Sequence, residues 1–423
     1  MRMTDFLAAE WKPALGCTEP AAVAWAAALA AEQSGGAVLQ VRLVCDPRTY
    51  KNCYAVGLPN SDRATGILWA LALGSLLPDS SLGLRSFEGT NPALIEMARV
   101  LLARHSVHVE VDPQQSCLLV DVTVVREKGV GRAVLEREHT HLARLEKDGA
   151  LVGGAEAVEK SVGAPSLREE AASLSIQRLM ELARTLTSED RERLREGVAL
   201  NLAIARHGLS MLPPGFVVPA GQDSQTRLSR LVRAGVYARM SGESMTVMTL
   251  AGSGNKGITA SVPISLWGRE SGHPEAKVEE ALAFACLMTT AATWHLGTLS
   301  AICGAANAAG IGIASGLVFL EGGSAHQVGF AVSNMVGNVA GMICDGAKIG
   351  CAMKTMTGVD AAFRSASLAL ANIGIPATDG IVGESGECSL ANLGRLAQHG
   401  MAGVDAEILR IMQDKLRRAG SAL

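Results

Sequence analysis

The chain has 423 residues, which is long enough for one large core and for two or three domains. Its 38 Lys and Arg nearly balance its 41 Asp and Glu, and no basic run carries interleaved aromatic residues, so nothing indicates a nucleic-acid partner. Aromatic residues make up only 4% of the chain while Gly numbers 46, so small and aliphatic residues carry the hydrophobic content.

The N-terminal segment lacks the features of a secretory signal. Acidic residues come early in it, and Lys12 and Pro13 interrupt the apolar run. We therefore expect a cytoplasmic protein, whose nine Cys are reduced thiols or metal ligands rather than a disulfide framework.

The first 150 residues mix helical and strand-like patterns. Residues 4–34 predict a helix that is broken at Pro13 and around Gly16 and Pro20. Further helices are expected over 63–77 and 91–105, where Asn91 can cap and Pro92 takes the first helical position. Alternating apolar residues predict strands over 38–46, 53–59, 107–112, 117–125, 131–138 and 141–149.

The pattern changes after Gly153-Gly154. Residues 166–206 are charged and periodic, as in amphipathic helices, and residues 277–375 predict small-residue, apolar helices. A strand is expected in this half over 245–250. The sequence thus predicts an α+β protein, with a mixed α/β domain over 1–160 followed by a mainly helical domain over 161–423.

One stretch is long enough to span a bilayer, because Ala281 to Leu320 contains no Asp, Glu, Lys or Arg. It is rich in Ala, Gly, Thr and Ser, however, and it would place His295 and Asn307 at bilayer depth. We expect buried helices there, and no membrane association.

Three cysteines of the helical half are candidate metal ligands. Cys344 and Cys351 are seven residues apart, so on a helix their thiols would share one face, and Cys303 precedes them by 41 residues. Three thiolates around a four-iron cluster would leave one iron open to substrate. A buried packing role for these cysteines remains open at this point. Packing is also the role we expect for the cysteines at 45, 53, 117, 286 and 388.

Cys17 lies directly before the helical run at 21–33. A thiol at a helix N-terminus has a lowered pKa, which makes Cys17 a candidate proton acceptor, with a buried loop cysteine as the alternative.

The segment AGSGNKG (251–257) satisfies G-x-G-x-x-G, but no βαβ unit surrounds it and no acidic residue ends a second strand, so a dinucleotide site is not our leading interpretation. We expect a loop that binds a substrate carboxylate through its backbone N–H groups and through Ser253, Gly254, Asn255 and Lys256, with an ordinary Gly-rich turn as the alternative. For the pair His139 and His141 we favour a structural or substrate-side role over a zinc site.

Taken in order, these segments resemble the L-cysteine desulfidase family, which is related to the α-chain of iron–sulfur L-serine dehydratases. The resemblance covers nearly the whole chain. It is carried by residues 13–24 (PALGCTEPAAVA), 51–60 (KNCYAVGLPN), 139–149 (HTHLARLEKDG), 251–258 (AGSGNKGI), 303–316 (CGAANAAGIGIASG) and 344–354 (CDGAKIGCAMK).

The resemblance implies a [4Fe–4S] cluster held by Cys303, Cys344 and Cys351, with Cys17 as the base. It implies a carbon–sulfur lyase without pyridoxal phosphate, which eliminates sulfide and ammonia from L-cysteine and leaves pyruvate. An L-serine dehydratase on the same scaffold, a non-enzymatic iron–sulfur sensor and a nucleotide-dependent oxidoreductase stay open as alternatives. The partner is a small amino acid, and the apolar helices leave room for a homodimer.

Overall fold

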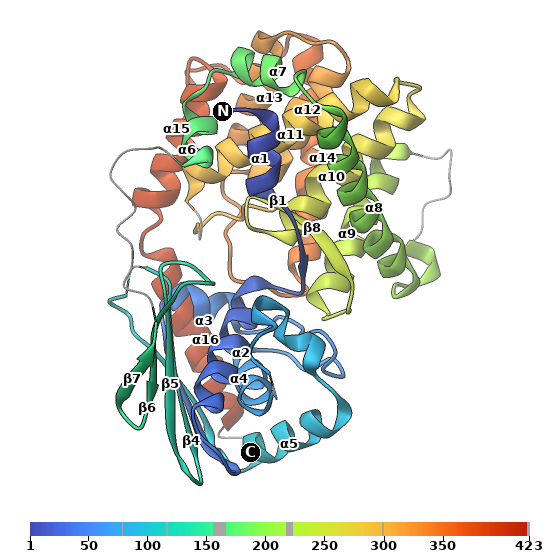
Figure 1. The fold of residues 1–423 in the computed structure, drawn as a ribbon. Coiled ribbons are helices and arrows are strands. Elements are labelled where there is room, and N and C mark those ends of the chain that lie inside the picture. The colour runs from blue at the N-terminus through green and yellow to red at the C-terminus, as the bar shows by residue number, and fades with distance from the viewer. Residues whose placement is uncertain (78, 116, 155–165, 217–222, 298–299, 421–423) are drawn as a thin grey trace.

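The computed structural model describes residues 1–77, 79–115, 117–154, 166–216, 223–297 and 300–420. Figure 1 shows two parts, one built on a β-sheet and one made mainly of helices, so the predicted α+β class is confirmed. The expected domain boundary near residue 160 lies outside the described residues.

Six strands form the sheet of the first part, in the order β3-β2-β4-β5-β6-β7. β2 and β3 run parallel, and every other neighbouring pair is antiparallel. The strands are β2 (Val38–Cys45), β3 (Val107–Val111), β4 (Leu119–Arg126), β5 (Gly129–Glu136), β6 (Leu142–Lys147) and β7 (Ala150–Gly153).

Alternate residues of the sheet face a helical layer. In β4 the side chains of Val120, Val122 and Val124 are fully buried while their neighbours are partly exposed, as expected for a half-covered strand. Helices α2 (Thr18–Glu32) and α4 (Ile67–Leu76) form this layer against the sheet, together with a 3₁₀ helix (Gly83–Gly89) and α5 (Pro92–Ala103). Eight of the residues that α2 buries are alanines from Ala21 to Ala31, so its backbone lies close to its neighbours.

Residues 53–59 do not form the predicted strand. The chain turns directly after β2 into α3 (Pro47–Cys53), because the carboxylate of Asp46 accepts hydrogen bonds from the backbone N–H groups of Arg48 (2.9 Å) and Thr49 (3.0 Å). An isolated bridge between Gly57 and Thr65 follows.

The second part packs its helices around α11 (Glu275–Leu296) and α12 (Asn307–Leu320), which are almost wholly buried. These two helices take up most of the uncharged stretch 281–320, as expected for buried helices. Within the described residues, none of the helices is both long enough and apolar enough to cross a membrane. The surrounding helices are α6 (Leu167–Ser173), α7 (Ile176–Ala183), α8 (Ser188–Ser210), α9 (Ser224–Met240), α10 (Gly254–Glu270), α13 (Ala325–Val339), α14 (Cys351–Leu370) and α15 (Gly386–Arg395).

The first elements of the chain pack with the helical part, and the last described helix packs with the sheet-bearing part (Figure 1). After α1 (Met3–Glu10), residues Trp11–Leu15 form β1 rather than the expected helix, and β1 pairs antiparallel with β8 (Thr246–Leu250). Pro13 cannot donate a helical hydrogen bond, and the indole of Trp11 is buried against the helical part. Conversely, α16 (Val404–Gly420) packs on α3, and its Leu409 joins the core of the sheet-bearing part.

The remaining cysteines divide into two groups. Cys45, Cys53 and Cys286 are fully buried in the core, as predicted. Cys117 and Cys388 are exposed, so the prediction that they serve in packing is wrong. Each of these two lies at the surface near the start of a strand or a helix, where it contributes little to the core.

Candidate active site

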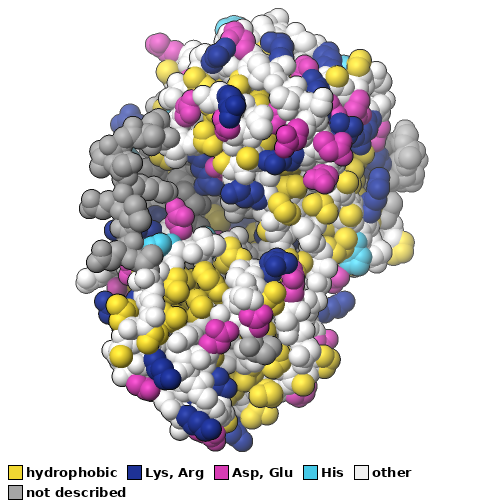
Figure 2. Space-filling model, viewed as in Figure 1, with side chains coloured by type: hydrophobic (Ala, Val, Ile, Leu, Met, Phe, Trp, Pro, Cys, Tyr) yellow, Lys and Arg dark blue, Asp and Glu magenta, His cyan; other side chains and the backbone are white. Residues whose placement is uncertain are grey.

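A cavity of about 150 Å³ lies where the sheet-bearing and helical parts meet. Figure 2 shows that the surface is also hollowed between the two parts, with Lys and Arg side chains along the helical rim. Chemically active side chains from both parts line the cavity: Cys17, Glu19, Lys51, Asn52, His139, Arg239, Ser253, Asn255, Lys256, Thr293, Cys303, Cys344 and Cys351. The structure thus brings together residues that the sequence places more than 300 positions apart.

Cys303 and Cys344 lie on two loops that are paired by their backbones. An isolated antiparallel bridge joins Ile302 to Ile343, directly beside the two cysteines. On either side of it, the N–H of Cys303 donates to the carbonyl of Met342 (2.9 Å) and the N–H of Cys344 donates to the carbonyl of Ala301 (2.7 Å). This local ladder fixes where both thiols enter the cavity.

Cys351 begins α14, and its Sγ lies 3.4 Å from the carbonyl oxygen of Gly346. Cys344 lies in the loop before that helix. The prediction that the two thiols share one helical face is therefore wrong, because positive φ at Gly346 breaks the helical path between them. The loop instead directs Cys344 into the same cavity that Cys351 lines.

Three cysteines are the donor type that binds iron–sulfur clusters. The described residues contain no group of three His, Cys, Asp or Glu close enough to hold one metal ion. Cluster ligands bind different irons, so their thiols need only surround a shared cavity. Burial, together with the nearby Cys344 and Cys351, raises the pKa of Cys303. The cysteine loop also carries cations, since Lys348 and Lys354 both pair with Asp345.

Cys17 is the N-cap residue of α2, as the sequence predicted, but its environment differs from the expectation. Burial raises the pKa of its thiol to about 11, and the guanidinium of Arg239 opposes that shift. The expectation of a lowered pKa is therefore wrong for the protein without bound groups, because the loss of hydration outweighs the favourable charges.

Arg239 was not singled out from the sequence, where it is one arginine among many on an amphipathic helix. Its side chain is 5% exposed, and it donates to the carbonyl of Gly16 (2.7 Å) and to Oδ1 of Asn255 (2.9 Å). Among the described residues no carboxylate pairs with it. A buried cation without a carboxylate partner favours an anion nearby, either a thiolate of Cys17 or a substrate group.

The Gly-rich segment forms the start of α10, with Ser253 as its N-cap residue. Asn255 and Lys256 are buried at the cavity, while Gly254 does not line it and packs against Arg239. The ammonium of Lys256 donates to the carbonyl of Ala251 (3.0 Å) and to the hydroxyl of Thr293 (3.2 Å). Burial lowers the pKa of Lys256 to about 7. β8 pairs antiparallel with β1, so this segment lacks the parallel βαβ setting of a dinucleotide site.

His139 and His141 lie in the turn between β5 and β6. Nδ1 of His141 lies 3.1 Å from the carbonyl of Glu136. His139 lines the cavity, and its buried Nε2 has no hydrogen-bond partner within the described residues. This placement fits the substrate-side role favoured for His139.

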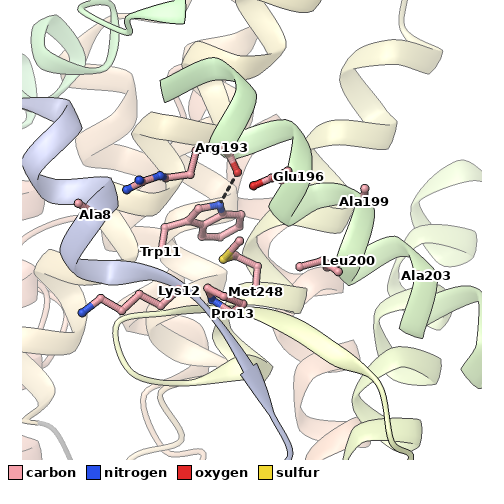
Figure 3. A pocket seen from close by; sticks show the side chains of 10 residues that line it. All are labelled: Ala8, Trp11, Lys12, Pro13, Arg193, Glu196, Ala199, Leu200, Ala203 and Met248. Atoms are coloured by element: carbon pink, nitrogen blue, oxygen red, sulfur yellow. Dashed lines mark hydrogen bonds between the residues drawn. The ribbon is translucent and has the colours of Figure 1, made fainter. Parts of the chain in front are cut away.

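A larger cavity of about 710 Å³ lies elsewhere, between β1 and α8 (Figure 3). Its walls are mostly apolar, and the indole of Trp11 donates to the backbone carbonyl of Arg193 (3.1 Å) on one side. Lys12, Arg193 and Glu196 are its charged residues. It contains no thiol or histidine, so we place the chemistry in the smaller cavity.

Comparison with known proteins finds relatives over nearly the whole chain. The profile of the serine dehydratase alpha chain matches residues 126–410. A UPF0597 protein of Geobacter sulfurreducens is 36% identical over 97% of this chain and 98% of its own. Others from Oleidesulfovibrio alaskensis and Clostridium tetani are 38% and 34% identical, over 98% and 95% of this chain and 98% and 96% of theirs. The kinship predicted from the ordered motifs is confirmed, and the chain belongs to the serine dehydratase alpha chain family.

Proposed function

We propose that this chain is an L-cysteine desulfidase, a lyase that works without pyridoxal phosphate and releases sulfide, ammonia and pyruvate. The observation that carries the proposal is the shared cavity, in which Cys17, Lys256 and the three candidate ligand cysteines all take part. The cavity has a volume of about 150 Å³ and is lined by residues of both parts.

Cys303, Cys344 and Cys351 would hold a [4Fe–4S] cluster. With three thiolate ligands, such a cluster supplies an iron that can act as a Lewis acid on the substrate's leaving group. Arg239 supports a negatively charged occupant, because it lines the cavity and no carboxylate among the described residues pairs with it, whereas the charge of Lys51 is offset by Asp405.

The start of α10 binds the substrate carboxylate in this proposal. The free N–H groups of a helix N-terminus attract anions, and this helix has 17 residues. Lys256 is 7% exposed and adds a positive charge at the same place. A carboxylate fixed there limits which hydrogen of the substrate faces Cys17.

Cys17 takes the α-proton as its thiolate, and the cation of Arg239 favours that thiolate. The electron pair of the broken Cα–H bond forms the Cα–Cβ double bond as the Cβ–S bond breaks, and sulfide leaves with the electron pair of the Cβ–S bond. The aminoacrylate that remains tautomerises to an imine. Water then hydrolyses the imine to pyruvate and ammonia, so no oxidant or reductant is consumed.

The test is turnover by anaerobically purified protein. We expect a brown protein that releases equal amounts of sulfide and pyruvate from L-cysteine. A colourless, folded protein that holds zinc or no metal would contradict the cluster. A protein that keeps its cluster but turns over no amino acid would support the sensor function instead.

L-serine dehydratase is the second candidate, and the serine dehydratase alpha chain match favours it. The elimination machinery is common to both substrates, and only the leaving group differs. Comparing kcat/KM for L-cysteine and L-serine on the same preparation decides between them, since the ratio reports differential transition-state binding. A higher value for L-serine would replace our proposal.

A further inference from the structure

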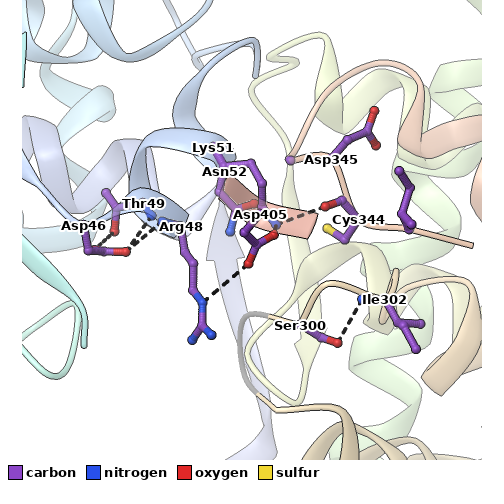
Figure 4. Close-up of polar contacts among 12 residues, drawn as sticks. Asp46, Arg48, Thr49, Lys51, Asn52, Ser300, Ile302, Cys344, Asp345 and Asp405 are labelled. Atoms are coloured by element: carbon purple, nitrogen blue, oxygen red, sulfur yellow. Dashed lines mark hydrogen bonds and ion pairs between the residues drawn. The ribbon is translucent and has the colours of Figure 1, made fainter. Parts of the chain in front are cut away.

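Lys51 lies between the two parts of the molecule, and its side chain is 2% exposed. Its ammonium donates to the backbone carbonyl of Cys344 (3.0 Å) and to Oδ1 of Asp405 (2.5 Å), as Figure 4 shows. Cys344 is a candidate cluster ligand, and Asp405 begins the C-terminal helix α16. One buried cation therefore joins α3, the loop of Cys344 and the last helix of the chain.

The backbone of Lys51 touches the same loop. Gly346 has a φ of +91°, and a Cβ built on it would lie 2.1 Å from the carbonyl oxygen of Lys51. A side chain at that position would push the loop away from α3. Lys51 thus contacts the loop on both sides of Asp345, through its side chain and through its backbone.

The neighbouring residue of α3 reaches the segment of the proposed base. Nδ2 of Asn52 donates to Oε1 of Glu19 (3.1 Å), two residues after Cys17. α3 itself is anchored to the sheet, because the carboxylate of Asp46, its N-cap residue, also accepts from the backbone N–H of Leu119 in β4 (3.0 Å). One short, anchored helix therefore contacts the segment of the proposed base and the loop of a proposed ligand.

We propose that Lys51 is a positioning residue, which holds the loop of Cys344 in register with the segment of Cys17, and that Asp405 keeps the Lys51 ammonium in place. The inference rests on the proposed function, because that function makes Cys344 a cluster ligand. The contacts themselves exist without a cluster. A buried ammonium that loses its carboxylate is strongly destabilised, so the tie depends on both partners.

The experiment compares Lys51→Met and Asp405→Asn with a matched control, Arg48→Met. Arg48 faces the same carboxylate at 3.7 Å, but its side chain is 47% exposed and it does not contact the loop of Cys344. Backbone hydrogen exchange of residues 344–350 is measured first on cluster-free protein. We expect exchange about tenfold faster in the two test variants, with unchanged exchange in β4, and wild-type rates in Arg48→Met.

The second measurement follows loss of the visible absorption under a chelator, with the paramagnetic-resonance spectrum of the loaded protein. We expect about tenfold faster loss and an altered spectrum in Lys51→Met and Asp405→Asn only. Unchanged loop exchange in both test variants would overturn the inference, whatever the cluster does. A wild-type protein without a cluster would overturn the proposed function, while the exchange result would still decide the role of Lys51. If Lys51→Met fails to fold, Asp405→Asn carries the same test.

Discussion

The sheet-bearing part and the helical part differ in what they bring to the cavity. The helical part supplies the three candidate ligand cysteines and the start of α10, whereas the sheet-bearing part supplies Cys17, Glu19, Lys51, Asn52 and His139. In our proposal one part holds the cofactor and the substrate, and the other removes the proton. The division predicts that substitutions in the two parts fail in different ways.

Loss of a ligand in the helical part should have the largest effect. We expect Cys344→Ser to lose the cluster and to reduce sulfide release to background, because the remaining two thiols cannot retain it. Visible absorption and iron content check this. Full activity with normal iron content in this variant would contradict the ligand assignment.

Loss of the base in the sheet-bearing part should leave the cofactor in place. We expect Cys17→Ser to keep its iron and colour while kcat falls by about 10³-fold, within the range for removal of a general base. Iron analysis and turnover are measured on the same sample. Loss of colour would instead make Cys17 a ligand and would remove the division between the two parts.

Arg239 lies on α9 of the helical part, and its charge lowers the pKa of Cys17 in the sheet-bearing part. Its replacement should therefore change how activity depends on pH. The charged and titratable groups around Cys17 include Arg239, Glu19, Cys351 and Cys53, and burial raises its pKa to about 11. A base must lose its proton, so activity should rise with pH. Arg239→Met removes a charge that lowers this pKa, so the rising limb should move to higher pH and activity at pH 7 should fall about tenfold.

The conservative variant Arg239→Lys keeps the positive charge and should restore part of the activity at neutral pH. A rising limb at the same pH in Arg239→Met and in the wild type would show that the guanidinium does not influence the proposed base.

A packing change inside the sheet-bearing part should lower stability without changing iron content. A Cβ on Gly74 would lie 2.3 Å from the carbonyl oxygen of Ala24, so Gly74→Ala forces α4 away from α2. We expect about 1–3 kcal/mol of destabilisation by denaturant titration, with normal iron content in the folded fraction. Iron loss at full stability would mean that the two parts are more tightly coupled than the division assumes.

The smallest effect is expected at the exposed sheet surface. Arg42 pairs with Glu110 across β2 and β3, and both side chains are about 60% exposed. Arg42→Ala should change the unfolding free energy by less than about 0.5 kcal/mol and leave turnover unchanged, since exposed ion pairs contribute little. A larger change in either quantity would show that this surface contributes to stability or to activity.

Local patterns predicted most elements but not how they meet. The strands and the helices of the second half follow from periodicity and capping, whereas β1 was missed because its partner β8 lies more than 200 residues away. Cys17 was found because it precedes a helix. Lys51 and Arg239 could not be found, because only the folded chain reveals a buried cation, and Asp405 becomes informative only once α16 returns to α3.

The packing of α16 on the sheet-bearing part has a consequence for biosynthesis. Helix α16 completes the packing around α3, so Lys51, which contacts the loop of Cys344, gains its ion pair with Asp405 only after α16 has been synthesised. If the chain holds the proposed cluster, we therefore expect stable cluster binding to require α16. A chain that ends before Val404 should lose the visible absorption faster under a chelator than the chain that includes α16.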